Sequence, residues 1–164
     1  MRTLTKNRLR DINDDLWSLI VRTRDNFVCK MCGTQTKHSE AHHIFGKVIK
    51  ITRWNIDNGI TLCFYCHRFK MHGGNLSNEN RIELFRKILG REKYEKLKLK
   101  AESLLIVKFN LEFCKEEFKR LMYLTVDMNI ATNSDTVPRY IVKELFPEWF
   151  PTKEMLKDYE EVKE

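Results

Sequence analysis

Two Cys-x2-Cys pairs constrain the fold of this chain more than any other feature. Cys29 and Cys32 form the first pair, Cys63 and Cys66 form the second, and 30 residues lie between the pairs. Two such pairs make a closed, tetrahedral, all-thiolate zinc site, which has a structural role because no position is left for water. Disulfide bonds and a redox dithiol are the alternatives, but a redox dithiol needs only one pair. We therefore expect a structural Zn²⁺ on these four cysteines.

The N-terminal segment indicates where the protein resides. "MRTLTKNRLRDINDD" is polar, and the apolar run "LWSLIV" that follows is too short for a signal-peptide core or a membrane span. We expect an intracellular, cytoplasmic protein without a membrane partner, and thiols in that compartment stay reduced and available to metals. The remaining cysteine, Cys114, falls in a helical pattern and is expected to be a small core residue.

The positive charge of the chain is concentrated in its middle third. The net charge is +7, and residues 41–100 carry 13 Lys and Arg against 5 Asp and Glu, whereas residues 101–164 carry 9 against 13. A localised positive field fits a polyanionic partner, with nucleic acid as the first candidate. A lysine-rich face that is simply solvated is the alternative, and charge alone does not decide between them.

Hydrophobic periodicity predicts a mixed α+β protein, and 42% hydrophobic residues are enough to bury a core. Apolar spacing favours a helix over residues 11–24, and the stretch from Cys29 to Phe45 looks like a zinc knuckle followed by a turn and short strands. The apolar stretch "ITL" at 60–62 follows a turn, and a short helix after Cys66 is expected to end at Gly73 and Gly74. A capped helix is predicted from Ser77 or Asn78 to Gly90, followed by two amphipathic helices within 91–109 and 110–129 that we expect to pack as a hairpin.

The histidines lie close to the cysteine pairs in the sequence. His42 and His43 stand between the pairs, and His67 directly follows Cys66. If zinc joins the two pairs, His67 can approach His42, and an ion held by two imidazoles still accepts water and a phosphate oxygen. Side chains alternate along a strand, so His43 would point to the other face, where it could take a proton from water. An isolated histidine is usually a satisfied surface or core residue, and we interpret His38 in that way.

Two segments carry a resemblance to a known family. "AHHIFGK" and "RWNIDNGITLCFYCH" resemble the HNH nuclease motif in its four-cysteine form, as in the small HNH and recombination endonucleases of bacteriophages and prophages. The resemblance covers about residues 17–100 and is most specific over 29–73. It implies a small zinc-stabilised ββα-metal core, flanked by an N-terminal helix and C-terminal helices. It also implies a metal-dependent DNA endonuclease that leaves 5′-phosphate and 3′-hydroxyl ends in the cytoplasm of a bacterial host.

The resemblance also implies roles for individual residues. His42 and His67 match the metal ligands, His43 matches the general base that activates water, and Asn58 matches the asparagine that orients the loop and constrains the base. The catalytic ion is expected to be Mg²⁺ or Mn²⁺, and imidazole ligands also accept Ni²⁺, Co²⁺ or Zn²⁺.

The sequence departs from the family pattern at one ligand position. Many members have another ligand four residues after the one that His67 matches, but Met71 stands there and the nearest histidine is His72. On an ideal α-helix, five residues correspond to about 140° of rotation, against ~40° for four. Coordination by His72 and completion of the shell by water therefore remain alternatives.

Basic residues are clustered in sequence around this motif. As candidates for phosphate contacts we take Lys47, Lys50, Arg53, Arg68 and Lys70. Each could equally be a solvated surface charge.

The chain is expected to divide into three parts. These are the nuclease core with its N-terminal helix (1–76), a helical extension (77–130) and a tail that is a candidate for binding another phage DNA-processing protein (131–164). Two other functions stay open: a zinc-stabilised DNA-binding module without catalysis, and an accessory protein of phage recombination or packaging. Oligomeric state is not predicted.

Overall fold

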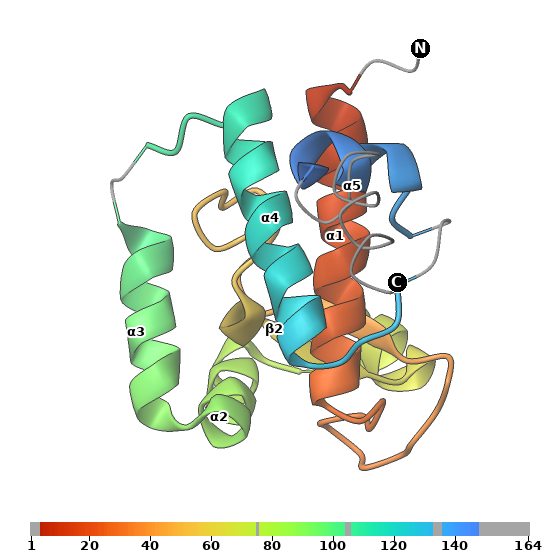
Figure 1. Cartoon of the computed structure of the whole chain (residues 1–164). Helices are drawn as coiled ribbons and strands as arrows, with labels where there is room; N and C mark the ends of the chain where they lie inside the picture. The colour runs from red at the N-terminus through yellow and green to blue at the C-terminus, as the bar shows by residue number, and fades with distance from the viewer. Residues whose placement is uncertain (1–3, 75, 104–105, 133–135, 148–164) are drawn as a thin grey trace, which may run out of the picture.

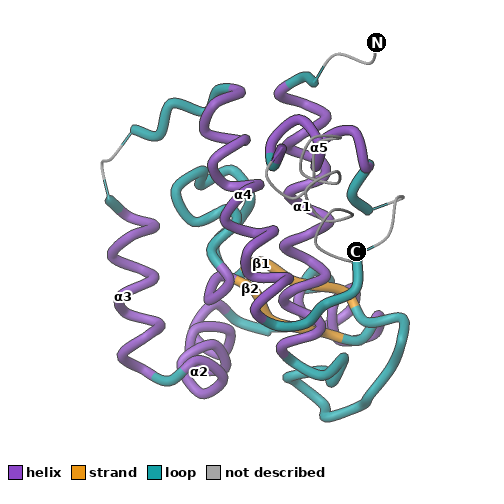
Figure 2. The backbone as a smooth tube through the Cα atoms, viewed as in Figure 1, coloured by secondary structure: helices purple, strands orange, loops and turns teal. Residues whose placement is uncertain are grey.

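A computed structural model describes residues 4–74, 76–103, 106–132 and 136–147 of the chain. Within these ranges the protein is α+β, as expected: helices surround one small antiparallel sheet (Figures 1 and 2). The elements in chain order are α1 (Lys6–Arg24), β1 (Glu40–His43), η1 (Ile56–Asn58), β2 (Gly59–Leu62), η2 (Cys66–Met71), α2 (Asn78–Leu89), α3 (Arg91–Glu102), α4 (Leu111–Asp127) and α5 (Arg139–Leu145). In the described part, none of the helices combines the length and the apolar character that a membrane crossing requires.

Helix α1 starts one and a half turns earlier than the apolar spacing predicted. The Thr5 side chain caps it by accepting a hydrogen bond from the backbone N–H of Arg8. The first turn is polar apart from Leu9, which explains why periodicity alone placed the start near residue 11. The buried side chains Leu9, Ile12, Leu16 and Ile20 recur every three or four residues and form one apolar stripe.

The first hydrophobic core joins α1 with α4 and α5. Helix α4 lies along α1 (Figure 1) and presents Cys114, Phe118, Leu121 and Met122 to it. Cys114 is thus a buried core residue, as the sequence predicted.

The expected pairing of α3 with α4 is wrong. Helix α3 instead packs beside α2, and α4 packs on α1. The physical reason is the size of the apolar faces, because α3 buries only Tyr94 and Leu97 and has little surface to offer to α4.

The second core is built around the sheet and the cysteines. β1 and β2 pair antiparallel with His42 opposite Ile60 and His43 opposite Gly59 (Figure 2). One face of the sheet is covered by α1, and residues of α2 and α3 complete the second core. Its buried members are Cys29, Ile60, Leu62, Cys66, Met71, Phe85 and Tyr94.

Helix α2 confirms the predicted cap and stop. The Ser77 side chain accepts a hydrogen bond from the backbone N–H of Asn80, and Gly90 ends the helix with a φ of 84°. A positive φ is the conformation that glycine adopts without strain, so this position sets the turn from α2 into α3.

The C-terminal segment is described only in part. Residues 133–135 and 148–164, which include most of the predicted partner-binding tail, lie outside the described residues. Within the described part, Val137, Ile141, Leu145 and Phe146 are buried in the first core. A partner for residues 131–164 stays a prediction.

Candidate metal centres

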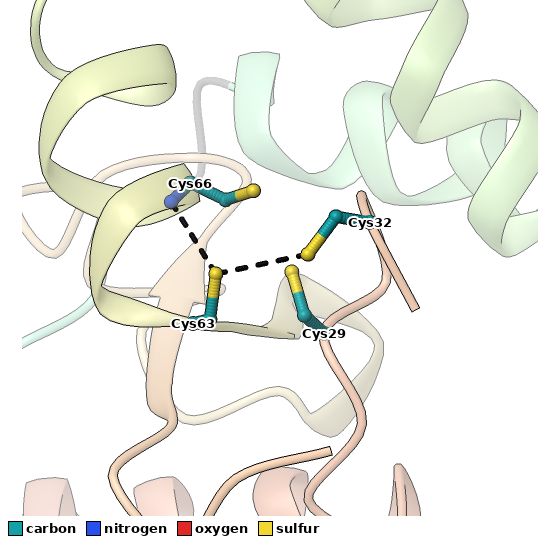
Figure 3. A group of neighbouring side chains, drawn as sticks. All are labelled: Cys29, Cys32, Cys63 and Cys66. Carbon is teal, nitrogen blue, oxygen red and sulfur yellow. Dashed lines mark hydrogen bonds between the residues drawn. The ribbon is translucent and has the colours of Figure 1, made fainter. Parts of the chain in front are cut away.

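The four cysteines converge on one point. Figure 3 shows their sulfur atoms pointing toward one another. Cys29 and Cys32 come from the loop after α1, Cys63 directly follows β2, and Cys66 is the first residue of η2. All four sulfurs lie within 4.8 Å of one another, and the Sγ atoms of Cys32 and Cys63 are 3.7 Å apart. A tetrahedron with Zn–S bonds of about 2.3 Å has edges of about 3.8 Å. The cluster therefore fits a structural metal such as zinc.

The local structure of both pairs suits this cluster. Gly33 follows the first pair with a φ of 76°, which lets its backbone N–H turn back to the carbonyl of Cys29. In the second pair, the backbone N–H of Cys66 donates to the Sγ atom of Cys63. Hydrogen bonds with Thr34 lower the pKa of the Cys32 thiol to about 6, whereas burial raises the pKa of Cys29 and of Cys66. A bound cation would favour the thiolate form of all four.

Three histidines form a second cluster. The ring nitrogens of His42, His67 and His72 lie within 4.8 Å of one another, and the Nε2 atoms of His67 and His72 are 3.3 Å apart. His42 comes from β1, and the other two come from η2 and its C-terminal end. Nitrogen ligands of one transition-metal ion, each about 2.0–2.1 Å from it, have a comparable separation. The arrangement can therefore hold one ion.

A π-helix explains why His72 joins the cluster although it stands five residues after His67. In η2 the backbone N–H of His72 donates to the carbonyl of His67 at 3.2 Å, which is the i→i+5 bond of a π-helix. This wider turn places residues five apart on the same face, so the rotation expected for an ideal α-helix does not apply. Gly73 fits closely at the end of η2, because a Cβ there would lie 2.3 Å from the carbonyl oxygen of Phe69.

Glu40 is a member of the site that the sequence reasoning missed. Its carboxylate accepts a hydrogen bond from Nδ1 of His67, so the Nε2 lone pair of that ring is available to a metal. This hydrogen bond lowers the pKa of Glu40. A sequence signal did exist, because Glu40 stands two residues before His42 and therefore shares its face of the strand.

His43 points away from this cluster, as strand alternation predicts. Its ring stacks on Trp17 of α1 with centroids 3.7 Å apart, and its Nε2 lies 2.9 Å from the carbonyl oxygen of Arg53. A carbonyl oxygen only accepts hydrogen bonds, so Nε2 carries the proton and Nδ1 keeps a lone pair. The ring is thus held in one orientation and one tautomer.

Burial keeps the histidines of β1 neutral. It is the main cause that lowers the pKa of His43 to about 4 and of His42 to about 3, and the charges of His67 and His72 add to the effect on His42. At neutral pH both rings therefore have a free lone pair. His42 can use it for a metal ion, and His43 can use it for a proton.

Asn58 holds the loop that carries the Arg53 carbonyl. Its side chain is fully buried, accepts a hydrogen bond from the N–H of Phe45, and donates to the carbonyl oxygens of Phe45 and Thr52. These bonds join both ends of the loop between β1 and η1. The role that the family resemblance implied for Asn58, orienting this loop, is compatible with them.

The five candidate phosphate-binding cations have different environments. The guanidinium of Arg53 is buried against the Asp14 carboxylate, at 2.7 and 2.9 Å, and links the loop to α1. Lys47 is exposed, 3.5 Å from the same carboxylate, and Lys50 lies 4.8 Å from the ring centre of Phe109. The remaining two, Arg68 and Lys70, both project from η2. Arg68 lies 3.4 Å from the Glu40 carboxylate. Arg53, Lys47 and Arg68 thus all have an acidic partner. Arg53 is the buried one, and the others lie nearer to solvent.

Helix α2 contributes residues near the histidine cluster that the sequence did not indicate. The ring of Phe85 stacks at 6.3 Å from that of His42, and the positive charge of Arg81 contributes to the lowered pKa of His42 and His72. Both residues are distant in sequence from the motif, and no local pattern distinguishes them from other helix residues.

Comparison with known proteins gives no assignment for this chain: no family model, no curated protein and no solved structure matches it.

Proposed function

We propose that the protein is a metal-dependent DNA endonuclease of the HNH type, with a structural zinc on the four cysteines and a separate catalytic ion on the histidines. The observation that carries the proposal is the division of the adjacent histidines. His42 lies with His67 and His72, whereas His43 lies on the opposite face with its Nδ1 lone pair free. A hydrolase that combines a metal ion with a general base needs this division.

The residues support a hydrolytic step on a phosphodiester. His43 Nδ1 takes a proton from water, whose oxygen forms a bond to phosphorus while the bond to the 3′-oxygen breaks and that oxygen gains a proton from solvent. Trp17 and the Arg53 carbonyl keep the base aligned during this transfer. A divalent ion on His42, His67 and His72 would polarise a phosphate oxygen and stabilise the negative charge on the leaving group.

The donor set favours some ions over others. Three imidazole nitrogens suit Ni²⁺, Co²⁺ or Zn²⁺ and are less suited to Mg²⁺, which prefers oxygen ligands. Mn²⁺ accepts both kinds of ligand. We therefore propose a transition-metal ion, with Mg²⁺ as a weaker activator.

DNA is the proposed substrate because of the surface charge near the site. Lys47, Lys50, Arg68 and Lys70 project from the loop and helix that flank the histidines, and phosphate contacts from such cations position a duplex without reading its sequence. A phage or prophage origin and a cytoplasmic location are part of the same proposal.

A nicking assay tests the proposal. We expect the wild-type protein to convert supercoiled DNA to open-circular or linear forms with Mn²⁺, Ni²⁺ or Co²⁺. His43→Gln should lower the rate by about 10²- to 10⁴-fold, because the amide can still donate to Arg53 but cannot accept the proton. His38→Gln is the matched control, since His38 lies outside both clusters.

Zinc content and melting temperature should stay unchanged in His43→Gln. Equal cleavage by His43→Gln and wild type would overturn the assigned base. If the protein binds DNA but does not cleave it with any of the divalent ions tested, the result would favour a zinc-stabilised DNA-binding module instead.

A further inference from the structure

Three aromatic side chains on the second Cys-x2-Cys segment are exposed to solvent. Phe64 and Tyr65, between Cys63 and Cys66, are 57% and 59% exposed, and Phe69 of η2 is 50% exposed. Their rings touch, since the Phe69 centroid is 6.1 Å from that of Phe64 and 5.4 Å from that of Tyr65. We call these three residues the aromatic face. Exposed aromatic clusters of this kind mark interaction sites.

The π-helix sorts this segment into three faces. Residues five apart lie together, so Cys66 and Met71 are buried, His67 and His72 meet at the proposed catalytic ion, and Phe64 and Phe69 meet at the surface. One short segment, residues 64–72, thus carries the aromatic face and two of the proposed metal-binding histidines. A ligand on the aromatic face is therefore held by the same segment as two of the proposed metal ligands.

The positive charges near the aromatic face indicate what kind of ligand binds there. Arg68 and Lys70 flank Phe69 in the sequence, and the Lys70 ammonium lies 5.8 Å from the ring centre of Tyr65. Arg68 is exposed and lies 3.4 Å from the Glu40 carboxylate. A ligand that suits both features has flat π-surfaces and negative charge. Nucleic acid combines the two, because bases stack on aromatic rings and phosphates pair with cations.

We propose, on the basis of the nuclease function above, that the aromatic face stacks on unpaired bases beside the scissile phosphate. In an intact duplex each base face is covered by its neighbours, so a ring cannot stack on it without unstacking a step. Single strands, forks and branched DNA expose base faces without that cost. The aromatic face therefore directs the enzyme to DNA with unpaired nucleotides near the cut.

Equilibrium binding by the full-length, zinc-loaded protein tests this proposal without requiring cleavage. One sequence would be prepared as a single strand, as a fork with an unpaired arm and as a continuous duplex, and binding would be followed by fluorescence anisotropy without added catalytic metal. The test variant carries Phe64→Leu, Tyr65→Leu and Phe69→Leu, which keeps apolar bulk and removes the rings. We expect about tenfold or greater loss of affinity for the single strand and fork, and less than twofold for the duplex.

Two further measurements make the test specific. A 2-aminopurine in the unpaired arm should be quenched by the wild type and not by the leucine variant, because quenching reports stacking. Lys70→Gln should instead weaken all three DNA forms to a similar degree and reduce the salt dependence. Melting temperature and zinc content establish that each variant is folded.

The outcomes separate this inference from the nuclease proposal. Equal losses for all three DNA forms, or no loss, would overturn the stacking role even if the protein cleaves DNA. Ring-dependent binding to unpaired bases by a protein that never cleaves would sustain the stacking role and end the nuclease proposal. Light scattering is a further check, because it could instead find a dimer for the wild type and a monomer for the leucine variant. That result would show that a second copy covers the aromatic face, and it would overturn the inference.

Discussion

The two hydrophobic cores of the protein are stabilised in different ways. The first joins α1, α4 and α5 through large side chains such as Trp17, Trp54 and Phe118. The second is smaller, and two of its buried members are the thiols of Cys29 and Cys66. Apolar burial can stabilise the first core alone, whereas the second has fewer apolar groups, and a metal on its cysteines would join its segments.

The proposed site lies where these cores meet. His42 packs near Phe85 of the second core, and His43 stacks on Trp17 of the first. Two adjacent residues of one strand are thus anchored in different cores. The proposed metal ligands and the proposed general base can therefore be perturbed separately, and four predictions test that separation.

The largest effect is expected from Cys66→Ser. The apparent binding energy of a structural zinc, about 10–16 kcal/mol in small zinc domains, contributes directly to folding. The variant should lose zinc, and hydrogen exchange should rise in β2, η2 and α2 far more than in the contact between α1 and α4. Metal analysis and exchange mass spectrometry measure both effects.

Cys114→Ala is the matched control, because Cys114 is buried in the first core, away from the other thiols. It should retain zinc. Full zinc content or unchanged exchange in Cys66→Ser would contradict the assigned role of the cysteine cluster.

The next largest effect is expected from Phe118→Ala, which perturbs the first core instead of the second. Phe118 is fully buried in the first core, and removal of a buried phenyl ring costs about 3–5 kcal/mol of unfolding free energy. We expect a lower denaturation midpoint by helical circular dichroism, with zinc content unchanged. Loss of zinc from the folded variant would show that the cores are one cooperative unit.

A smaller effect is expected from Gly59→Ala, at the boundary between the cores. A Cβ on Gly59 would lie 2.5 Å from Val21 Cγ2 and 2.6 Å from Trp17 Cζ2. Because Val21 and Trp17 must move to make room, the unfolding free energy should fall by about 1–3 kcal/mol. The Trp17 ring should also shift relative to the His43 ring. The proposed cleavage rate should fall at unchanged zinc content.

Gly46→Ala serves as the control, because nothing lies within 4 Å of a Cβ at Gly46. Equal stability of the two alanine variants would argue against the close contact between β2 and α1.

The last prediction concerns the effect of pH on stability. Burial alone would raise the pKa of Asp14, but hydrogen bonds from Arg53 and Trp54 outweigh it and the pKa lies below its ordinary value of 3.8. The carboxylate therefore stabilises the fold fully above pH 3.8, and this contribution disappears as pH falls through the lower, folded-state pKa.

Asp14→Asn tests this directly. It should lower the unfolding free energy by about 1–3 kcal/mol at pH 7, because Arg53 loses its partner. The difference from wild type should shrink as pH falls below 3.8, which denaturant titrations of both proteins at each pH would measure. A difference that stays constant with pH would contradict the ionised pair.

Several features could be predicted from local sequence patterns. The spacing of Cys29, Cys32, Cys63 and Cys66 indicated one metal cluster, because each short pair presents two sulfurs whatever surrounds it. The α+β class, the caps of α2 and the opposite faces of His42 and His43 also followed from local rules.

Other features depended on the tertiary structure. His72 joins the histidine cluster only because η2 is a π-helix, and the ion pair of Arg53 with Asp14 joins residues 39 positions apart. The pairing of α4 with α1 was likewise decided by which apolar faces were largest. Local patterns report the geometry within one element, whereas these contacts depend on which distant surfaces and partners remain available once the chain has packed.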